Sequence, residues 1–255
     1  DPMIGRLKPK SKFSRNVLTL MTGTTIAQGL SIAVTPILSR IYSPHDFGIF
    51  ALYIAVISIG NSIATGRYEL AIMMPQKDTD AANIVMLSIL VALGISTLML
   101  FSVIIFNSAL TTFFGDPEIS DILYFAPLAV LLTGIYQSFN YWCNRRKYFK
   151  TLSNNRVLQG SGSAAGQVSF GVAQIGPTGL VAGSIAAQLL GVGALAKRVR
   201  ENDKKEFEKV SVASIIYNAK LYFKYPVYSA FGALVNNAGT QAPIFIITKF
   251  FFKFK

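Results

Sequence analysis

The chain has 255 residues, of which 52% are apolar and only 14% are charged. Soluble domains average about 25% charged residues, so a water-soluble fold of this size would lack polar surface. The net charge of +12 lies in the gaps between apolar runs, which argues against nucleic-acid binding and is typical of a membrane protein. One cysteine (Cys143) and one histidine (His45) exclude an intrachain disulfide, a cysteine or histidine metal cluster, and catalysis by two histidines.

Two long apolar runs, residues 16–41 and 47–66, open the chain. A bilayer core of about 30 Å is crossed by about 20 apolar residues in a helix, so each run predicts a membrane span. Between them, Ser43 suits a helix N-cap, Pro44 the first helical position and Asp46 the acid of a capping box. We therefore expect the chain to begin as a membrane hairpin.

Five more spans are predicted from later apolar runs, which begin or end at acidic residues, prolines and glycines. They cover residues 81–106, 119–141, 152–173, 178–196 and 226–248, and the glycine-containing run 152–173 is the weakest by hydropathy. The resulting divisions are a cytoplasmic basic arm (1–15), a first transmembrane lobe of six spans (16–200), a cytoplasmic loop with an amphipathic lead-in (201–225) and the start of a second lobe (226–255). Residues 197–210 are expected to form a charged loop.

The distribution of Lys and Arg predicts the orientation. With a cytoplasmic N-terminus, the inner segments hold 20 of the 24 Lys and Arg residues, and the outer loops among the first six spans hold only Arg40. This bias is the positive-inside pattern of a multi-pass membrane protein. The count places Arg145, Arg146, Lys147, Lys150 and Arg156 in the inner connection between the fourth and fifth spans.

One glycine-rich stretch matches a dinucleotide-binding pattern, G-x-G-x-x-A, from Gly160 to Ala165. It follows a basic loop rather than a strand, and no acidic residue lies about 20 positions later, so we reject a nucleotide site. Gly162 and Gly166 instead predict a small-residue face for close helix packing.

Five polar residues are candidates for a substrate path: Arg40, Arg67, Glu69, Asn237 and Gln241. The two arginines lie at span ends, where an arginine either anchors a helix at the interface or holds a phosphate with paired donors. Asn237 and Gln241 share one helix face, where they either line a wet cavity or bond neighbouring helices. The Arg145–Lys147 cluster sets topology or attracts anionic lipid headgroups. No span carries an acid–base pair or a placed nucleophile, so we do not expect an enzyme.

Several motifs in a fixed order resemble the bacterial polysaccharide transporters, the lipid-linked oligosaccharide (O-antigen type) flippases of the multidrug/oligosaccharidyl-lipid/polysaccharide exporter superfamily. These motifs are Ser39 to Gly48, Gly66 to Ile72, Trp142 to Lys150, Asn155 to Gln159, Gly179 to Gly183, and Tyr225-Pro226.

The resemblance implies an all-α polytopic fold with 12 to 14 helices in two six-helix lobes around a cavity. This chain would supply the first lobe and the first helix of the second. The implied function is movement of an undecaprenyl-pyrophosphate-linked oligosaccharide across the bacterial inner membrane by alternating access, for surface polysaccharide synthesis. The implied partners are membrane lipids and the polysaccharide polymerase and glycosyltransferases, with no cofactor. The alternatives are a drug or peptidoglycan-precursor exporter of the same superfamily, and a non-transporting scaffold of a glycan-assembly complex.

Overall fold

The computed structural model describes residues 12–252, and every regular element in this range is a helix. The helices are α1 (Lys12–Ile41), α2 (Pro44–Ile63), α3 (Tyr68–Ala71), α4 (Asp78–Phe114), α5 (Ile119–Leu123), α6 (Ala126–Arg145), α7 (Phe149–Val172), α8 (Pro177–Phe207), α9 (Val212–Leu221), the π-helical turn η2 (Tyr225–Ala230) and α10 (Phe231–Phe252). The all-α class is therefore confirmed. Residues 1–11 of the predicted basic arm and the last three residues lie outside this range.

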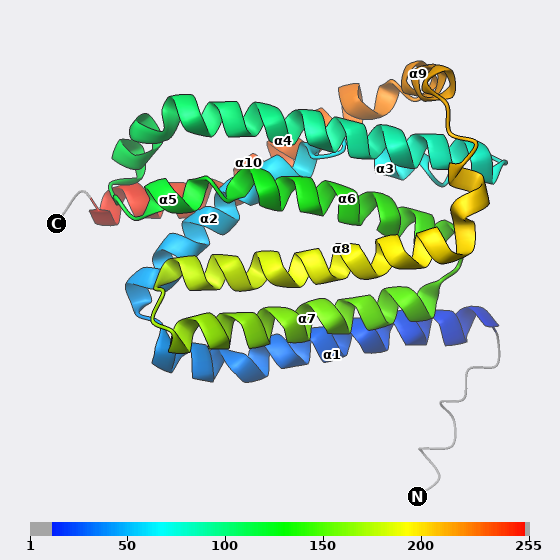
Figure 1. Cartoon of the computed structure of the whole chain (residues 1–255). Helices are drawn as coiled ribbons and strands as arrows, with labels where there is room; N and C mark the ends of the chain where they lie inside the picture. Colours follow the sequence, from blue (N-terminus) through cyan, green and yellow to red (C-terminus); the bar gives the residue numbers. More distant parts are fainter. Residues whose placement is uncertain (1–11, 253–255) are drawn as a thin grey trace, which may run out of the picture.

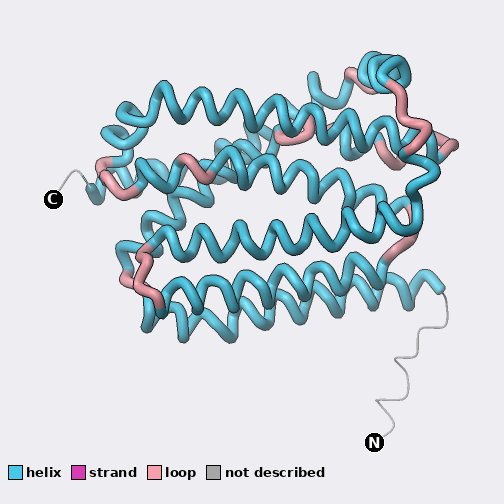
Figure 2. Tube along the Cα trace, in the orientation of Figure 1, coloured by secondary structure: helices cyan, strands magenta, loops and turns pink. Residues whose placement is uncertain are grey.

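The long helices form a bundle in which α1, α7, α8, α6 and α4 lie side by side in that order (Figure 1). Helix α2 crosses behind them and packs on α6 and α8, and α10 packs on α2 and reaches α4. The connections run along the two ends of the bundle, as the loop colouring shows (Figure 2). We call these the α9 end, where α1 begins, and the α5 end, where α2 begins.

Five helices are long and apolar enough to cross a membrane. They are the segments Val17–Ile41, Pro44–Ile63, Asp78–Phe114, Ile119–Arg145 and Pro177–Phe207. The protein is therefore a multi-pass membrane protein. Among the described residues, α7 also forms a full-length helix beside α1 and α8, although its composition is too polar to qualify by hydropathy alone.

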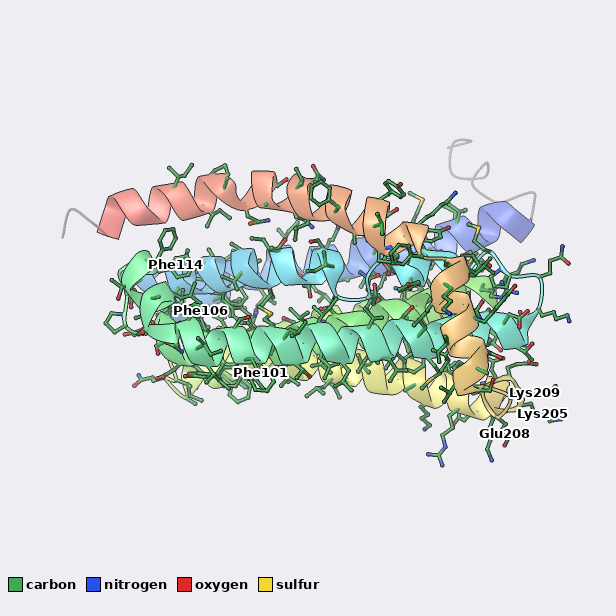
Figure 3. The ribbon with its side chains drawn as sticks, turned by 90° about the horizontal axis from the view of Figure 1, so that it is seen from above. Phe101, Phe106, Phe114, Lys205, Glu208 and Lys209 are labelled. Atoms are coloured by element: carbon green, nitrogen blue, oxygen red, sulfur yellow. The ribbon has the colours of Figure 1, made fainter. Side chains whose placement is uncertain are left out.

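Large apolar side chains cover the outer face of α4. Leu98, Phe101, Ile105 and Phe106 are all more than half exposed, and Phe101 and Phe106 project from the bundle near the α5 end (Figure 3). Such a continuous exposed apolar surface is unfavourable in water but suits contact with lipid chains. This face of α4 therefore faces the bilayer.

The predicted cap at the start of α2 is confirmed. The Ser43 hydroxyl accepts a hydrogen bond from the Asp46 amide at 3.2 Å, and the Asp46 carboxylate accepts one from the Ser43 amide at 2.8 Å. Just before this cap, the buried Tyr42 donates its hydroxyl proton to the Gln167 carbonyl at 2.7 Å. The turn between the first two helices is thus fastened to α7.

The small-residue face of α7 packs closely on α8, as predicted. A Cβ added at Gly166 would lie 2.9 Å from the Cα of Gly183, and one added at Gly162 would lie 3.5 Å from the Cα of Ala187. The other side of α7 is equally close to α1, because a Cβ at Gly23 would lie 2.8 Å from the Cα of Ser153. Helix α7 is therefore held between two neighbours by backbone approach.

The prediction of a charged loop at residues 197–210 is wrong over most of this range, because helix α8 continues to Phe207. Lys, Arg and Glu are good helix formers, and their charges need only to lie outside the bilayer. The pairs Lys197–Glu201 (4.0 Å) and Lys204–Glu208 (3.4 Å) add support with the favourable i,i+4 spacing. The helix bends once, at Asp203, whose backbone is not helical.

The bend at Asp203 is fixed by a buried polar cluster at the α9 end. The Asp203 carboxylate accepts hydrogen bonds from Trp142 Nε1 and from the Tyr148 hydroxyl, each at 3.0 Å, and pairs with Arg146 Nε at 3.0 Å. Arg145 pairs with Asp78 at 2.9 Å. From the sequence, Arg145 and Arg146 were expected to fix the membrane topology or to attract lipid headgroups. In the structure they hold the ends of α4, α6 and α8 together.

Candidate functional site

An open pocket of about 240 Å³ lies between α1, α6 and α7, and Gln28 and Ser31 on its α1 wall are exposed. Six of its eight lining residues have polar side chains, and polar groups within a membrane usually need a partner or a wet cavity. The lining residues are Thr24, Ala27, Gln28, Ser31, Tyr136, Arg156, Gln159 and Gly160. We call this the α1–α7 pocket.

Arg156 is the only charged residue of the α1–α7 pocket. It is the eighth residue of α7, which places it about 10 Å along the helix axis from the helix start. Its guanidinium donates a hydrogen bond to the Thr24 hydroxyl of α1. This single bond leaves most of the guanidinium's five donors for a ligand or for water.

Arg156 was counted among the charges of an inner connection although it falls in the predicted span 152–173, and the structure places it in the helix α7. The polar run from Ser153 to Arg156 lowers local hydropathy, and two of its members, Asn155 and Arg156, bond to neighbouring helices. Asn155 donates to the Gly191 carbonyl of α8 at 2.8 Å, and Gln159 donates to the Asn155 side-chain oxygen at 2.7 Å. No pattern in the sequence indicates that Asn155 and Arg156 pair with residues of other helices.

The pocket wall depends on a close approach of α1 to α7. A Cβ at Gly160 would lie 3.1 Å from the Cα of Ala27. The helices therefore come near enough for Arg156 to reach Thr24, while Gln28 and Ser31 continue the polar surface along α1. Gly160 lies on the side of α7 that faces α1, apart from the predicted Gly162–Gly166 face that packs on α8.

Arg67 and Glu69 lie together at the α9 end, between α2 and α4. Arg67 has a left-handed backbone (φ 62°), and its Nη1 lies 3.7 Å from Glu69 Oε1. Glu69 is buried and accepts a hydrogen bond from the Thr65 hydroxyl. The Nε of Arg67 is buried without a hydrogen-bond partner among residues 12–252.

Gln241 and Asn237 bring polar groups of α10 to α2. Gln241 Nε2 donates to Ser58 Oγ at 3.3 Å, and Asn237, one turn earlier, is half-buried. The buried side-chain oxygens of Gln241 and Asn61 have no hydrogen-bond partner in the described part of the chain. The contact with Ser58 fits helix bonding, and the two unsatisfied oxygens leave acceptors for another group.

Arg40 stands apart from the other predicted residues. It is exposed at the α5 end, whereas Arg67 is at the α9 end, and the 20-residue helix α2 lies between them. That helix spans about 30 Å. The five sequence candidates therefore occupy three separate places, and Arg156, which lies in the α1–α7 pocket, was not among them.

Comparison with protein families gives one decisive result. A family model described as polysaccharide biosynthesis protein matches residues 37–253. The chain belongs to this family of polysaccharide biosynthesis proteins. Searches of curated proteins and of solved structures found no match.

Membership in the polysaccharide biosynthesis protein family confirms the resemblance to polysaccharide transporters drawn from the motifs. The matched range includes Arg156, Arg67 and Gln241, while the α1 wall of the pocket at Thr24 and Gln28 precedes it. Together with its membrane helices, the family makes this chain a membrane protein of polysaccharide synthesis.

Proposed function

We propose that this protein is an exporter that moves a lipid-linked oligosaccharide across the bacterial inner membrane. The carrier lipid is undecaprenyl pyrophosphate, and movement runs from the inner to the outer leaflet by alternating access. Family membership and the multi-pass membrane fold support a role in handling polysaccharide at a membrane. The alternative cargoes, a drug or a peptidoglycan precursor, use the same architecture but are not favoured by a polysaccharide family.

The observation that carries the proposal is the position of the half-buried Arg156 between α7 and α1, in an open pocket with hydroxyl and amide groups. A guanidinium binds phosphate through paired donors and is always charged. An arginine at the centre of a membrane helix costs about 2.5–3.5 kcal/mol on insertion scales, and Arg156, the eighth of the 24 residues of α7, costs less. An intramembrane charge is still a functional hypothesis by default, and pyrophosphate is a ligand of matching charge and geometry.

The orientation follows from the distribution of Lys and Arg, which is concentrated at the α9 end, in keeping with a cytoplasmic N-terminus. In this arrangement Arg156 lies in the inner half of the membrane, where a carrier lipid loaded in the cytoplasm would first meet it. Arg67 and Gln241, on the α2–α10 side, are the proposed second wall of the path. The α1–α7 pocket contains no carboxylate, so we propose transport without catalysis.

Export of surface polysaccharide in cells tests this function. Arg156→Ala in the intact protein is expected to abolish export, and Arg156→Lys to retain part of it, because lysine keeps the charge but not the paired donors. Arg200→Ala is the matched control, since Arg200 is exposed on α8 outside the pocket. Normal export by Arg156→Ala would contradict the proposal and favour a scaffold role in the glycan-assembly complex. Exchanging the glycan in the same assay separates a polysaccharide exporter from one for other cargo.

A further inference from the structure

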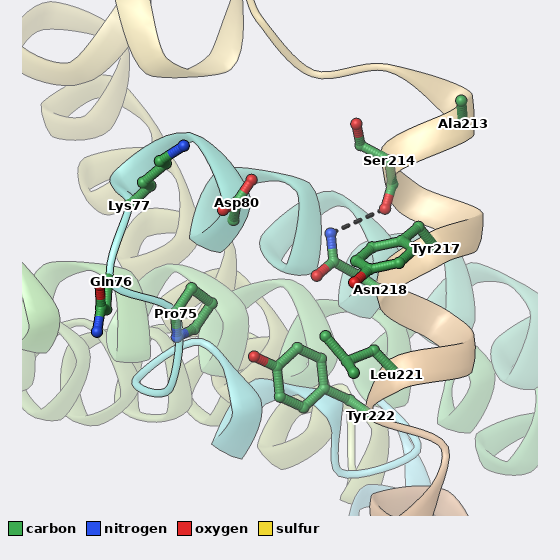
Figure 4. A pocket seen from close by; sticks show the side chains of 10 residues that line it. All are labelled: Pro75, Gln76, Lys77, Asp80, Ala213, Ser214, Tyr217, Asn218, Leu221 and Tyr222. Atoms are coloured by element: carbon green, nitrogen blue, oxygen red, sulfur yellow. Dashed lines mark hydrogen bonds between the residues drawn. The ribbon is translucent and has the colours of Figure 1, made fainter.

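A second pocket, of about 510 Å³, lies at the α9 end of the bundle. One wall is the connection from α3 to α4, and the other is helix α9 (Figure 4). Its lining residues are Pro75, Gln76, Lys77, Asp80, Ala213, Ser214, Tyr217, Asn218, Leu221 and Tyr222. We call it the α9 pocket, and its volume lies within the usual range for ligand sites, about 300–1,000 Å³.

The α9 pocket combines aromatic rings with hydrogen-bonding groups. Lys77 and Asp80 stand on one wall, and Tyr217, Asn218 and Tyr222 stand on the other (Figure 4). Tyr217 is 65% exposed, so one face of its ring is open to a ligand. Burial, followed by the neighbouring Tyr225 and Asp80, raises the pKa of Tyr222, so its hydroxyl keeps its proton at neutral pH.

This composition fits a neutral polyhydroxylated ligand. The C–H face of a sugar ring packs on an aromatic ring, whose face is electron-rich, while amide and carboxylate groups bond its hydroxyls. The two charged lining residues, Lys77 and Asp80, have opposite signs, so the pocket offers no net charge to an anion. A phosphate group is therefore a poorer match than a sugar.

The surroundings of the α9 pocket place it at the membrane surface. Helix α9 runs across the bundle end (Figure 3) and exposes Val212 and Ile216, with Phe223 following on the same side. Exposed apolar residues beside the lysines Lys220 and Lys224 are typical of a helix lying in the headgroup region. A ligand here can thus keep a lipid tail in the bilayer while its headgroup occupies the pocket.

We propose that the α9 pocket is a docking site for the sugar headgroup of the lipid-linked oligosaccharide on the cytoplasmic side, before the pyrophosphate reaches Arg156. This inference rests on the proposed export function and adds to it a separate glycan site. The α9 pocket binds the sugar, and the α1–α7 pocket binds the phosphate. The two pockets therefore contribute to different parts of substrate recognition.

Equilibrium binding to the purified intact protein in nanodiscs tests this assignment. The probes are undecaprenyl pyrophosphate carrying the oligosaccharide and undecaprenyl pyrophosphate without sugar. Tyr217→Ala is expected to weaken binding of the glycosylated lipid about three- to tenfold, the range for loss of one aromatic contact, and to leave binding of the sugar-free lipid unchanged. Gln76→Ala, at a second exposed lining position, is expected to act in the same direction.

Tyr228→Ala is the matched control, because Tyr228 is 73% exposed on η2 but does not line the pocket. The inference is overturned if Tyr217→Ala binds the glycosylated lipid as tightly as wild type, if Tyr228→Ala shows the same loss, or if the sugar-free lipid loses affinity equally. Failure of the wild-type protein to bind either lipid would instead overturn the export function itself. The two failures are thus distinguishable.

Discussion

The guanidinium of Arg156 on α7 donates a hydrogen bond to the hydroxyl of Thr24 on α1, joining two helices that are 132 positions apart in the chain at this point. The bond holds a permanent positive charge at the open α1–α7 pocket. It also gives the arginine a fixed direction, which a flexible side chain would otherwise lack. Because the partner is neutral, the charge itself remains available to an anionic substrate.

Thr24 should therefore affect substrate binding by positioning the side chain of Arg156. Thr24→Val keeps the side-chain shape but removes the hydroxyl, and we expect it to weaken affinity for undecaprenyl pyrophosphate by about 10- to 150-fold, because a hydrogen bond to a charged group contributes roughly 1.5–3 kcal/mol. Thr24→Ser retains the acceptor and should bind nearly as wild type. Equal affinities for the valine and serine variants would show that the hydroxyl does not position the arginine.

The difference between prediction and structure is clearest at α7. Hydropathy judges each residue by its affinity for water, so the polar groups around Asn155 and Arg156 made residues 152–173 the weakest predicted span, and Arg156 was counted with the charges of the inner connection. The structure satisfies these groups with the Gly191 carbonyl and the Thr24 hydroxyl, which are distant in sequence. Such pairing depends on tertiary packing, so no local sequence pattern predicts it.

Local signals were more informative elsewhere. The cap at Ser43 and the close packing of Gly166 follow from rules that involve neighbouring residues or one helix face. The helix beyond residue 197 was missed because charge density was taken as a loop signal, although it only marks the end of the membrane. The separate positions of Arg40 and Arg67 follow from the hairpin, yet both were assigned to one substrate path.

The approach of α7 to α8 predicts a steric effect at Gly166. Gly166→Ala places a methyl group 2.9 Å from the Gly183 backbone, which must shift, so we expect the free energy of unfolding to fall by about 1–3 kcal/mol. Gly193→Ala, on α8 with open space around it, should be neutral or slightly stabilising because alanine favours a helix. Thermal unfolding in detergent measures both, and equal stability of the two variants would contradict the packing.

The buried cluster at the α9 end predicts a larger loss. Asp203→Ala removes a fully buried carboxylate, leaves two hydrogen-bond donors without their partner, and leaves Arg146 paired only with Asp78. Each buried donor left unsatisfied costs about 1–3 kcal/mol. Glu208→Ala, at an exposed ion pair one turn beyond, should cost less than about 1 kcal/mol. Denaturation curves showing similar midpoints for both variants would rule out a structural role for the cluster.

Tyr42 predicts a stability change at alkaline pH. Burial, followed by the nearby Asp46, raises the pKa of Tyr42 above its usual value of 10.0, so the folded state holds this proton more tightly than the unfolded chain. Its stability contribution is present below pH 10 and is lost as the pH rises from 10 toward the raised pKa. Tyr42→Phe should be less stable by about 1 kcal/mol at neutral pH, through loss of the bond to Gln167. A stability difference from wild type that does not shrink above pH 10 would contradict this explanation.

The most direct test of the export function is lipid flipping by the intact protein in proteoliposomes. The assay follows the appearance of an undecaprenyl-pyrophosphate-linked oligosaccharide in the opposite leaflet, where an added lectin binds it. We expect wild type and Arg200→Ala to flip the lipid, Arg156→Lys to do so slowly, and Arg156→Ala to match protein-free vesicles. Flipping by Arg156→Ala at the wild-type rate would show that the charge in the α1–α7 pocket does not hold the substrate.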